Sequence, residues 1–369
     1  MKQPWIYSAR VDGAFIIGPA LITTALILLF RNSIAATQSI QPWMWGLLIV
    51  GVDVAHVYST LYRTYADADE LRARRTLYTL TPLLCWIVGT LLYSLGAIVF
   101  WRAIAYLAVF HFVRQQYGFM MIYARGERNY PSTYRRLDQT VIYLATLYPL
   151  IYWHTHMPRH FDWFVDGDFV ALPFPALNAL ALTTYVLALG LYVAKEAYIY
   201  VRERRVNLPK NLLLLGTALS WWIGIIYFNN DLAFTAANVI AHGVPYMALI
   251  WIYGRNQGDM QPGKTLFNLI PVRRFFSLAA VPLFAGLLVL FAWCEEGLWD
   301  GMVWVEHKHI FAPFRVLPLI DDKATLAWLV PLLALPQTTH YVLDAFIWRI
   351  REKGTPWKEI LFYRAQARS

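Results

Sequence analysis

Ten long apolar runs dominate the sequence, and each is long enough to cross a membrane as a helix. The chain as a whole is 58% hydrophobic and 15% charged, with a mean hydropathy of +0.42, which lies far outside the usual composition of a soluble domain. We therefore predict an all-α, polytopic integral membrane helical bundle of about ten transmembrane helices, forming a single domain over 1–369. The runs are 11–30, 43–62, 77–93, 97–123, 137–153, 175–201, 212–228, 232–254, 275–293 and 324–348.

The basic residues predict the orientation of these helices. Of the 32 Lys and Arg residues, 24 fall in alternate connecting segments, which the positive-inside rule assigns to the cytoplasmic side. Both termini are then cytoplasmic, and the net charge of +9 faces inner-leaflet headgroups. The same residues are dispersed over short loops, so we expect no nucleic-acid partner. The cytoplasmic segments are 1–10, 63–76, 124–136, 202–211, 255–274 and 349–369.

Four histidines lie inside separate apolar runs, and topology places them at similar depth. All four are on runs that cross in the same direction, 6 to 12 residues from the cytoplasmic end. At about 1.5 Å per residue they occupy a layer on the order of 10 Å thick. Buried imidazoles need partners, so this layer predicts a metal or haem site, although any one such histidine is often only a hydrogen-bonding strut between helices. These residues are His56, His111, His242 and His340.

Two of the histidines have an aspartate on the same helix face. Asp53 precedes His56 by three residues, and Asp344 follows His340 by four. A carboxylate at that spacing can ligate the same metal or orient the imidazole through its other nitrogen. Imidazoles with one or two carboxylates suit iron, and less specifically zinc, copper or manganese.

The other two histidines have neutral or basic company. Arg114 and Gln115 follow His111 by three and four residues, and Asn238 precedes the third histidine by four. Arg114 is expected to neutralise a carboxylate or to bind an anionic headgroup, and Gln115 to contact a ligand or to bridge helices. Tyr341 adjoins the last histidine, where packing competes with a hydrogen bond to a ligand.

Two segments resemble the bacterial membrane carotene-cleaving oxygenases of the Brp/Blh type. The segment 340–349 resembles their closing His, Asp, aromatic, Arg element, and 110–112 is similar to their His-Phe-Gly element, with Val113 in place of the glycine. His56 and His242 occupy the same order as the family's other two histidine elements. The His-to-Asp spacing is one residue shorter here, and the first aspartate precedes its histidine. The resemblance implies a helical membrane oxygenase with iron bound by intramembrane histidines, but not a carotene substrate.

The expected function is thus a non-haem iron oxygenase or hydroxylase, with one or two irons, in a bacterial inner (cytoplasmic) membrane. Its substrate is expected to be lipophilic, an isoprenoid or an acyl chain, entering from the surrounding membrane lipid. The sequence leaves open an electron donor or an oligomeric membrane partner. The expected metal ligands are His56, His111, His242, His340, Asp53 and Asp344; the catalytic residues are Asp53, Arg114 and Asp344; and the cofactor-binding residues are Gln115, Asn238 and Tyr341.

Three alternatives stay open on the sequence alone. Zinc or haem can replace non-haem iron, because histidines at equal depth on facing helices also suit a b-type haem in an electron-transfer protein. The polar residues can instead form the relay of a proton- or ion-coupled transporter. A structural or assembly subunit is the third alternative, and it leaves the polar layer unexplained.

Overall fold

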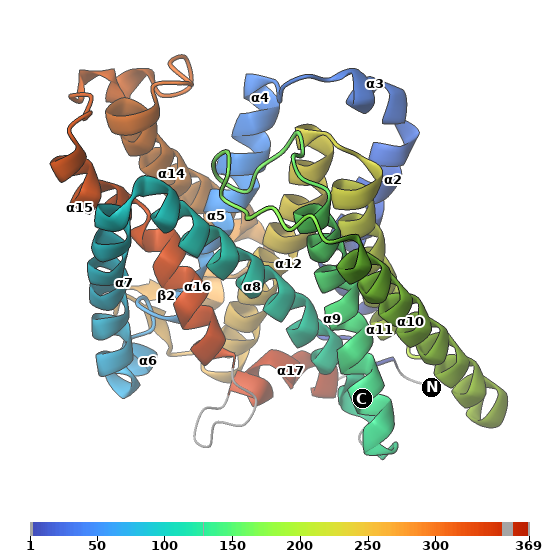
Figure 1. Ribbon diagram of the computed structural model, residues 1–369. Coiled ribbons are helices and arrows are strands. Elements are labelled where there is room, and N and C mark those ends of the chain that lie inside the picture. The colour runs from blue at the N-terminus through green and yellow to red at the C-terminus, as the bar shows by residue number, and fades with distance from the viewer. Residues whose placement is uncertain (1–2, 128, 349–356, 368–369) are drawn as a thin grey trace. The chain divides into compact units, whose positions relative to one another are not determined.

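The computed structural model describes residues 3–127, 129–348 and 357–367, and these are almost entirely helical (Figure 1). The described residues include two strands of two residues each, β1 (Thr265–Leu266) and β2 (Ile270–Pro271), which pair in antiparallel fashion. The predicted all-α class is confirmed.

Seven helical segments among the described residues are long and apolar enough to cross a membrane, which suggests a membrane protein. Each overlaps one of the predicted runs. Three of them bury only 17% to 22% of their most apolar window, as expected for helices that face lipid: those within 75–95, 175–203 and 278–304. The seven segments are Ala9–Leu29, Pro42–Arg63, Arg75–Leu95, Ala97–Glu127, Pro175–Glu203, Asp231–Met260 and Leu278–Trp304.

The three remaining predicted runs are also helical, but they are shorter, interrupted or less apolar. The last run breaks at Ala334, because Pro336 fits the first turn of a new helix and not the interior of a continuous one. The count of ten spans and the cytoplasmic termini therefore stay predictions. The helices concerned are α9 (Ser132–Thr155), α11 (Leu208–Trp221) with the π-helix η5 (Trp222–Tyr227), α15 (Lys323–Leu333) and α16 (Leu335–Ile347).

The chain divides into two compact units, each described here by itself. The first unit comprises Met1–Ile40, Phe112–Pro245 and Ala365–Ser369. Within it α9 packs against α10 and α11, and α11 packs against α2 (Figure 1). Besides α9, α11, η5 and parts of α8 (Ala97–Tyr123) and α12 (Asp231–Met260), it contains α1 (Ala9–Asp12), η1 (Gly13–Ile17), α2 (Gly18–Leu29), α3 (Arg31–Ala36), η4 (Ala124–Glu127) and α10 (Pro175–Glu203).

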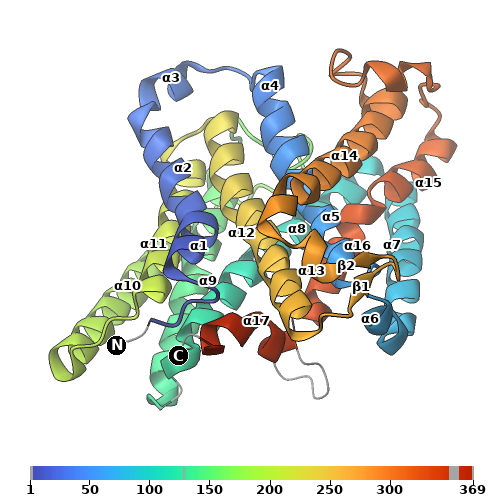
Figure 2. The same cartoon turned by 180° about the vertical axis from the view of Figure 1, so that it is seen from behind.

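The second unit comprises Gln41–His111 and Tyr246–Arg364. Within it α7 packs against α15 and α16, and α14 packs against η2 and α5 (Figure 2). The expected single-domain organisation stays a prediction. Besides the remaining parts of α8 and α12, both strands, α15 and α16, this unit contains α4 (Pro42–Trp45), η2 (Gly46–Val54), α5 (Ala55–Ser59), η3 (Thr60–Arg63), α6 (Ala68–Ala73), α7 (Arg75–Leu95), α13 (Val272–Phe275), η6 (Leu278–Ala280), α14 (Val281–Trp299), η7 (Asp300–Trp304), η8 (Ala312–Val316) and most of α17 (Trp357–Ala367).

One helix of the second unit has an irregular backbone next to a predicted site residue. The segment η2 is a π-helix of nine residues and leads directly into α5, which carries His56. Wide π-helical turns are rare and are found frequently at functional sites, where they turn a side chain away from its regular α-helical direction. Asp53 lies inside this π-helix, so its position relative to His56 departs from regular helical spacing.

Close packing of α7 on α15 gives a first prediction. A Cβ atom at Gly89 would lie 2.8 Å from Pro331 Cβ and 3.3 Å from Phe100 Cε2. We expect Gly89→Ala to lower the free energy of unfolding by about 1–3 kcal/mol, because a rigid proline ring cannot move aside. Thermal unfolding in detergent measures the effect. Gly286→Ala on α14 is the control, since nothing lies within 4 Å of its added Cβ; equal stability of the two variants would contradict the prediction.

Candidate metal centre

Three buried histidines of the second unit, His56, His111 and His340, are close enough to hold one metal ion. Each offers one ring nitrogen, and these nitrogens lie within 4.8 Å of one another. These residues and His242, which lies in the first unit, are only 1% to 3% exposed. The second unit alone thus offers three buried ligands to a metal, and the expected ligand role of His242 stays a prediction.

Among the three histidine rings of the second unit, those of His111 and His340 are the closest pair. His111 Nε2 lies 3.1 Å from His340 Nε2, with the ring centroids 4.6 Å apart and the planes inclined by 71°. Two nitrogens bound to one ion at about 2.0–2.1 Å would lie about 2.8–3.4 Å apart for bond angles from 90° to 109°. The observed separation fits a shared ion, and it also fits a single shared proton.

A chain of hydrogen bonds fixes the other ring nitrogen of His340. Tyr246 donates its hydroxyl hydrogen to Asp344 Oδ1 at 2.8 Å. The Tyr246 oxygen lies 3.0 Å from Thr60 Oγ1, which in turn lies 2.6 Å from His340 Nδ1. Because a carboxylate only accepts, Tyr246 uses its hydrogen on Asp344 and accepts one from Thr60. Thr60 then has only an acceptor to offer His340 Nδ1, so that nitrogen carries the proton and Nε2 keeps its lone pair.

The same carboxylate orients the second ring. Asp344 Oδ2 lies 3.5 Å from His111 Nδ1, so it favours a proton there and a lone pair on His111 Nε2. Asp344 thus contacts the Nδ1 side of both rings, directly in His111 and through Tyr246 and Thr60 in His340, whereas the two rings contact each other through Nε2. Carboxylates and hydroxyls in this position are what orients metal-ligating histidines. Asp344 therefore fits the orienting role that the sequence analysis offered as one of two alternatives.

Thr60 and Tyr246 were not among the predicted site residues. Thr60 follows His56 by four residues, so the helical spacing used for the aspartates would have found it. Tyr246 is separated from Thr60 by 186 positions, and no local pattern in the sequence indicates their hydrogen bond.

His56 completes the set in the second unit. Its ring centroid lies 5.0 Å from that of His340 and 6.5 Å from that of His111. Asp53 Oδ1 is 4.0 Å from His56 Nδ1, which is beyond hydrogen-bonding distance, and the Asp53 side chain is 31% exposed. Asp53 and His56 therefore face each other as predicted, but at a distance of 4.0 Å between the carboxylate oxygen and the ring nitrogen.

His242, in the first unit, is held by ring stacking and by its main chain. Its imidazole stacks on Phe112 at a centroid distance of 3.5 Å and an interplanar angle of 8°. Its carbonyl accepts a hydrogen bond of 2.9 Å from Gln115 Nε2. Gln115 therefore bridges α8 and α12 within this unit, which was one of its two expected roles.

A proline explains a second bridge between the same helices. Pro245 lacks the N–H that would bond the carbonyl of Ala241 in a regular helix. Gln116 Nε2 lies 3.5 Å from that carbonyl oxygen, while Gln116 Oε1 accepts a bond of 2.9 Å from Thr217. Neighbouring polar side chains commonly satisfy backbone groups that a proline frees in an apolar helix.

Two further predicted residues each contact a residue of their own unit. Asn238 donates to the carbonyl of Phe234 on its own helix at 2.8 Å. The ring of Tyr341 is buried, with its centroid 5.2 Å from that of His111. Their expected binding roles stay predictions.

Arg114 lies on the exposed side of α8. Its guanidinium donates to the hydroxyl of Tyr143 and lies 4.7 Å from the ring centroid of Tyr117. Within the described part of the chain it is thus held by tyrosines and not by a carboxylate. The expected catalytic role of Arg114 stays a prediction.

Comparisons of the chain with protein-family models, with curated proteins and with solved structures each find no match. The likeness to the carotene-cleaving oxygenases therefore still depends on the quoted residues alone. Of those, Arg349 lies outside the described residues.

The orienting role of Asp344 predicts a specific effect of removing its charge. Asp344→Asn replaces an acceptor-only group by an amide that can also donate, so His111 and His340 are no longer held with their protons on Nδ1. We expect affinity for a divalent metal to fall about 10- to 100-fold, measured by titration against a chelator of known affinity.

Asp53→Asn is the matched comparison, because this carboxylate lies 4.0 Å from its histidine. Its effect on metal affinity should be smaller than that of Asp344→Asn. Loss of the metal in Asp53→Asn with retention in Asp344→Asn would identify Asp53 as a ligand and contradict the orienting role of Asp344.

Proposed function

We propose that the protein is a membrane-embedded non-haem iron oxygenase or hydroxylase that acts on a lipophilic substrate, an isoprenoid or an acyl chain. One observation carries the proposal: His111 Nε2 and His340 Nε2 lie 3.1 Å apart, a separation that fits two ligands of one ion. The Asp344 carboxylate, whose side chain is 12% exposed, adds a negative charge that a metal ion would offset.

The choice of non-haem iron is supported by ligand chemistry and by distance. Neutral imidazoles with nearby carboxylates suit iron, with zinc as the alternative. In a bis-histidine haem the two ligand nitrogens lie on opposite sides of the iron, about 4 Å apart. The 3.1 Å separation between His111 Nε2 and His340 Nε2 instead fits ligands on adjacent positions of one ion. When bound, iron with open positions would supply the activation of dioxygen.

The surrounding residues have defined tasks in this proposal. His111, His340 and His56 would bind the ion. Asp344 and Thr60 hold the rings in the ligating tautomer. Apolar helices exclude bulk water from the buried nitrogens, and both dioxygen and an apolar substrate concentrate in hydrocarbon, which gives a physical reason to place the centre there.

The overall reaction sets what else the protein would need. Hydroxylation of a C–H bond consumes one dioxygen, two electrons and two protons, and yields the alcohol and water. That reaction requires an electron-donor partner. Cleavage of a C=C bond with one oxygen atom placed on each carbon yields two carbonyls and requires no external electrons. Oxygen consumption with and without a chemical reductant separates the two.

Metal content tests the proposal directly. We expect detergent-purified protein to contain about one or two irons per chain and to show no Soret band, because the ligand geometry does not suit a haem. His111→Ala and His340→Ala should each lose most of the iron, measured by elemental analysis. His309→Ala, in an exposed loop, is the control and should retain it. A Soret band would contradict non-haem iron in favour of electron transfer, and absence of any metal would favour a transporter or structural subunit.

Substrate class is tested on the same material. Iron-loaded protein in nanodiscs should consume dioxygen when supplied with isoprenoid or acyl-chain lipids, and the products should carry new oxygen atoms detectable by mass spectrometry with labelled dioxygen. Consumption should drop at least about tenfold in Asp344→Asn, because the ligating rings lose their orientation. Equal consumption in wild type and in His340→Ala would contradict an oxygenase centred on these histidines.

A further inference from the structure

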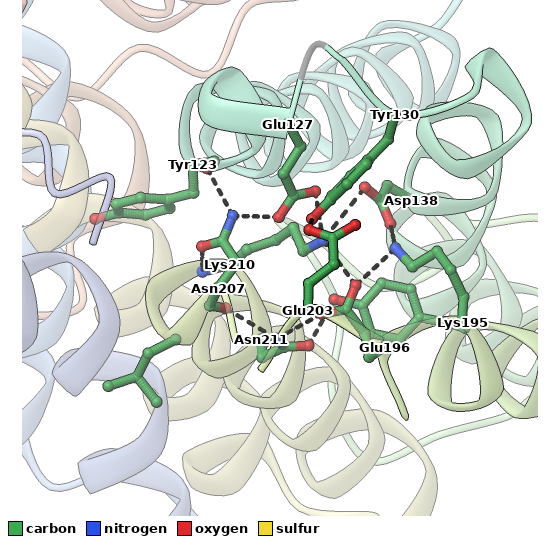
Figure 3. A network of polar contacts seen from close by, with 12 residues as sticks. Tyr123, Glu127, Tyr130, Asp138, Lys195, Glu196, Glu203, Asn207, Lys210 and Asn211 are labelled. Carbon is green, nitrogen blue, oxygen red and sulfur yellow. Dashed lines mark hydrogen bonds and ion pairs between the residues drawn. The ribbon is translucent and has the colours of Figure 1, made fainter. Parts of the chain in front are cut away.

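The first unit also contains a buried polar network of ion pairs, which does not include His242 (Figure 3). Lys210 Nζ lies 2.7 Å from Glu127 Oε2, 2.8 Å from Glu196 Oε1 and 3.6 Å from Asp138 Oδ2. Lys195 Nζ also contacts Asp138, and lies 2.7 Å from Glu196 Oε1. We call these two lysines and three carboxylates the five-charge cluster.

The five-charge cluster joins the polar ends of four helical elements. Glu127 ends η4, Asp138 lies on α9, Lys195 and Glu196 on α10, and Lys210 on α11. Both lysine side chains are at most 4% exposed. The cluster therefore holds the ends of these helices together through buried ion pairs, whose members must neutralise one another.

Charge within the five-charge cluster does not balance. Burial disfavours the ammonium of Lys210, but Asp138, Glu127 and Glu196 outweigh that effect, so the pKa of Lys210 lies above its usual value. Two ammonium groups thus face three carboxylates, which leaves one formal negative charge. A surplus buried charge is costly unless another group offsets it.

A pocket opens next to this surplus charge. It has a volume of about 300 Å³, at the low end of small-molecule sites, and Glu127 and Glu196 of the five-charge cluster form part of its lining. Arg204 and Arg205 line it as well. The pocket therefore presents carboxylates and guanidinium groups to the same small volume.

The arginines are exposed and only weakly engaged. Arg205 Nη1 lies 3.6 Å from Glu203 Oε2, and Arg204 lies 5.5 Å from the ring centroid of Tyr200. Such exposed contacts contribute little and can be exchanged for a stronger partner. Both residues directly follow α10, one of the helices long and apolar enough to cross a membrane. The pocket thus lies where α10 passes from its apolar stretch to a basic loop, at the depth of lipid headgroups.

We propose that this pocket binds the zwitterionic headgroup of an aminophospholipid, with the primary ammonium on Glu127 and Glu196 and the phosphate on Arg204 and Arg205. The ammonium would bring the five-charge cluster to neutrality and can donate three hydrogen bonds to carboxylates. Arginine is suited to phosphate because its planar fork donates two parallel hydrogen bonds. Asn207 lines the same pocket and holds Glu127 in place by donating to its Oε1 at 2.6 Å.

A headgroup series tests the proposal on the full-length protein in detergent. We expect phosphatidylethanolamine to bind at least about tenfold more tightly than phosphatidylcholine with the same acyl chains, because N-methylation removes the N–H donors. Native mass spectrometry with graded lipid gives the two affinities. Equal affinities would overturn the proposal. Free phosphoethanolamine distinguishes the source: weaker binding than the lipid is expected, and equal binding would assign the pocket to a soluble ligand instead.

Variants locate the binding to this pocket. Arg204→Gln with Arg205→Gln should weaken phosphatidylethanolamine binding about tenfold, and retained affinity would overturn the proposal. Arg202→Gln is the control, because Arg202 is exposed beside the pocket but does not line it. Glu127→Gln should bring the two lipids toward equal affinity. If this variant does not fold, the arginine variants still decide, since their side chains are exposed.

The pocket proposal is independent of the metal centre. Iron content and histidine variants should leave the lipid preference unchanged, and Arg204→Gln with Arg205→Gln should leave iron content unchanged. Loss of iron in that double variant would indicate general misfolding. In that case Arg205→Lys replaces it as the test, because lysine keeps the positive charge but lacks the planar fork of arginine. Unchanged lipid affinity in Arg205→Lys would overturn phosphate recognition through the arginine fork.

Discussion

The acceptor-only character of one carboxylate determines the arrangement at the histidine centre. Asp344 takes the hydrogen of Tyr246, which obliges Thr60 to donate to Tyr246 and to accept from His340. Through its other oxygen it faces His111. A single side chain thus decides which nitrogen of two imidazoles carries the proton. Its consequence is that His111 Nε2 and His340 Nε2, 3.1 Å apart, can hold either a shared proton or a bound cation between them.

Three helices besides α8 contribute side chains to this centre, namely α5, α12 and α16. Each of them contains or adjoins an irregular stretch of backbone. The π-helix η2 precedes α5, the break at Ala334 separates α15 from α16, and Pro245 interrupts the hydrogen bonding of α12. Each interruption costs backbone hydrogen bonds in an apolar environment, so it persists only where other groups satisfy the freed atoms. Gln116 does so at Ala241. In a regular helix the direction of each side chain is fixed by the period of 3.6 residues. The interruptions allow side chains next to them to point in directions that a regular helix does not permit.

Local spacing explains which parts could be predicted from the sequence. Long apolar runs predict the helices, because burial in lipid requires length and composition only. Depth counting brought the histidines together, and the four-residue spacing in α16 identified Asp344. The break at Ala334 was missed, although Pro336 indicates it. Tertiary hydrogen bonds could not be found this way: Thr60 and Tyr246 are 186 positions apart, and Lys210 contacts Glu127 across 83.

Buried polar groups in this chain follow two different designs, and the contrast bears on function. Where helices are only tied together, the chain uses neutral amides such as Gln115 and Gln116. Those contacts match donors with acceptors. At the histidine centre two imidazole nitrogens instead lie 3.1 Å apart, a separation that fits one shared proton or one shared metal ion. An amide would link the same helices through a fixed donor and acceptor, whereas a pair of imidazoles can release the shared proton and bind a cation in its place, which is the property that the proposed metal centre needs.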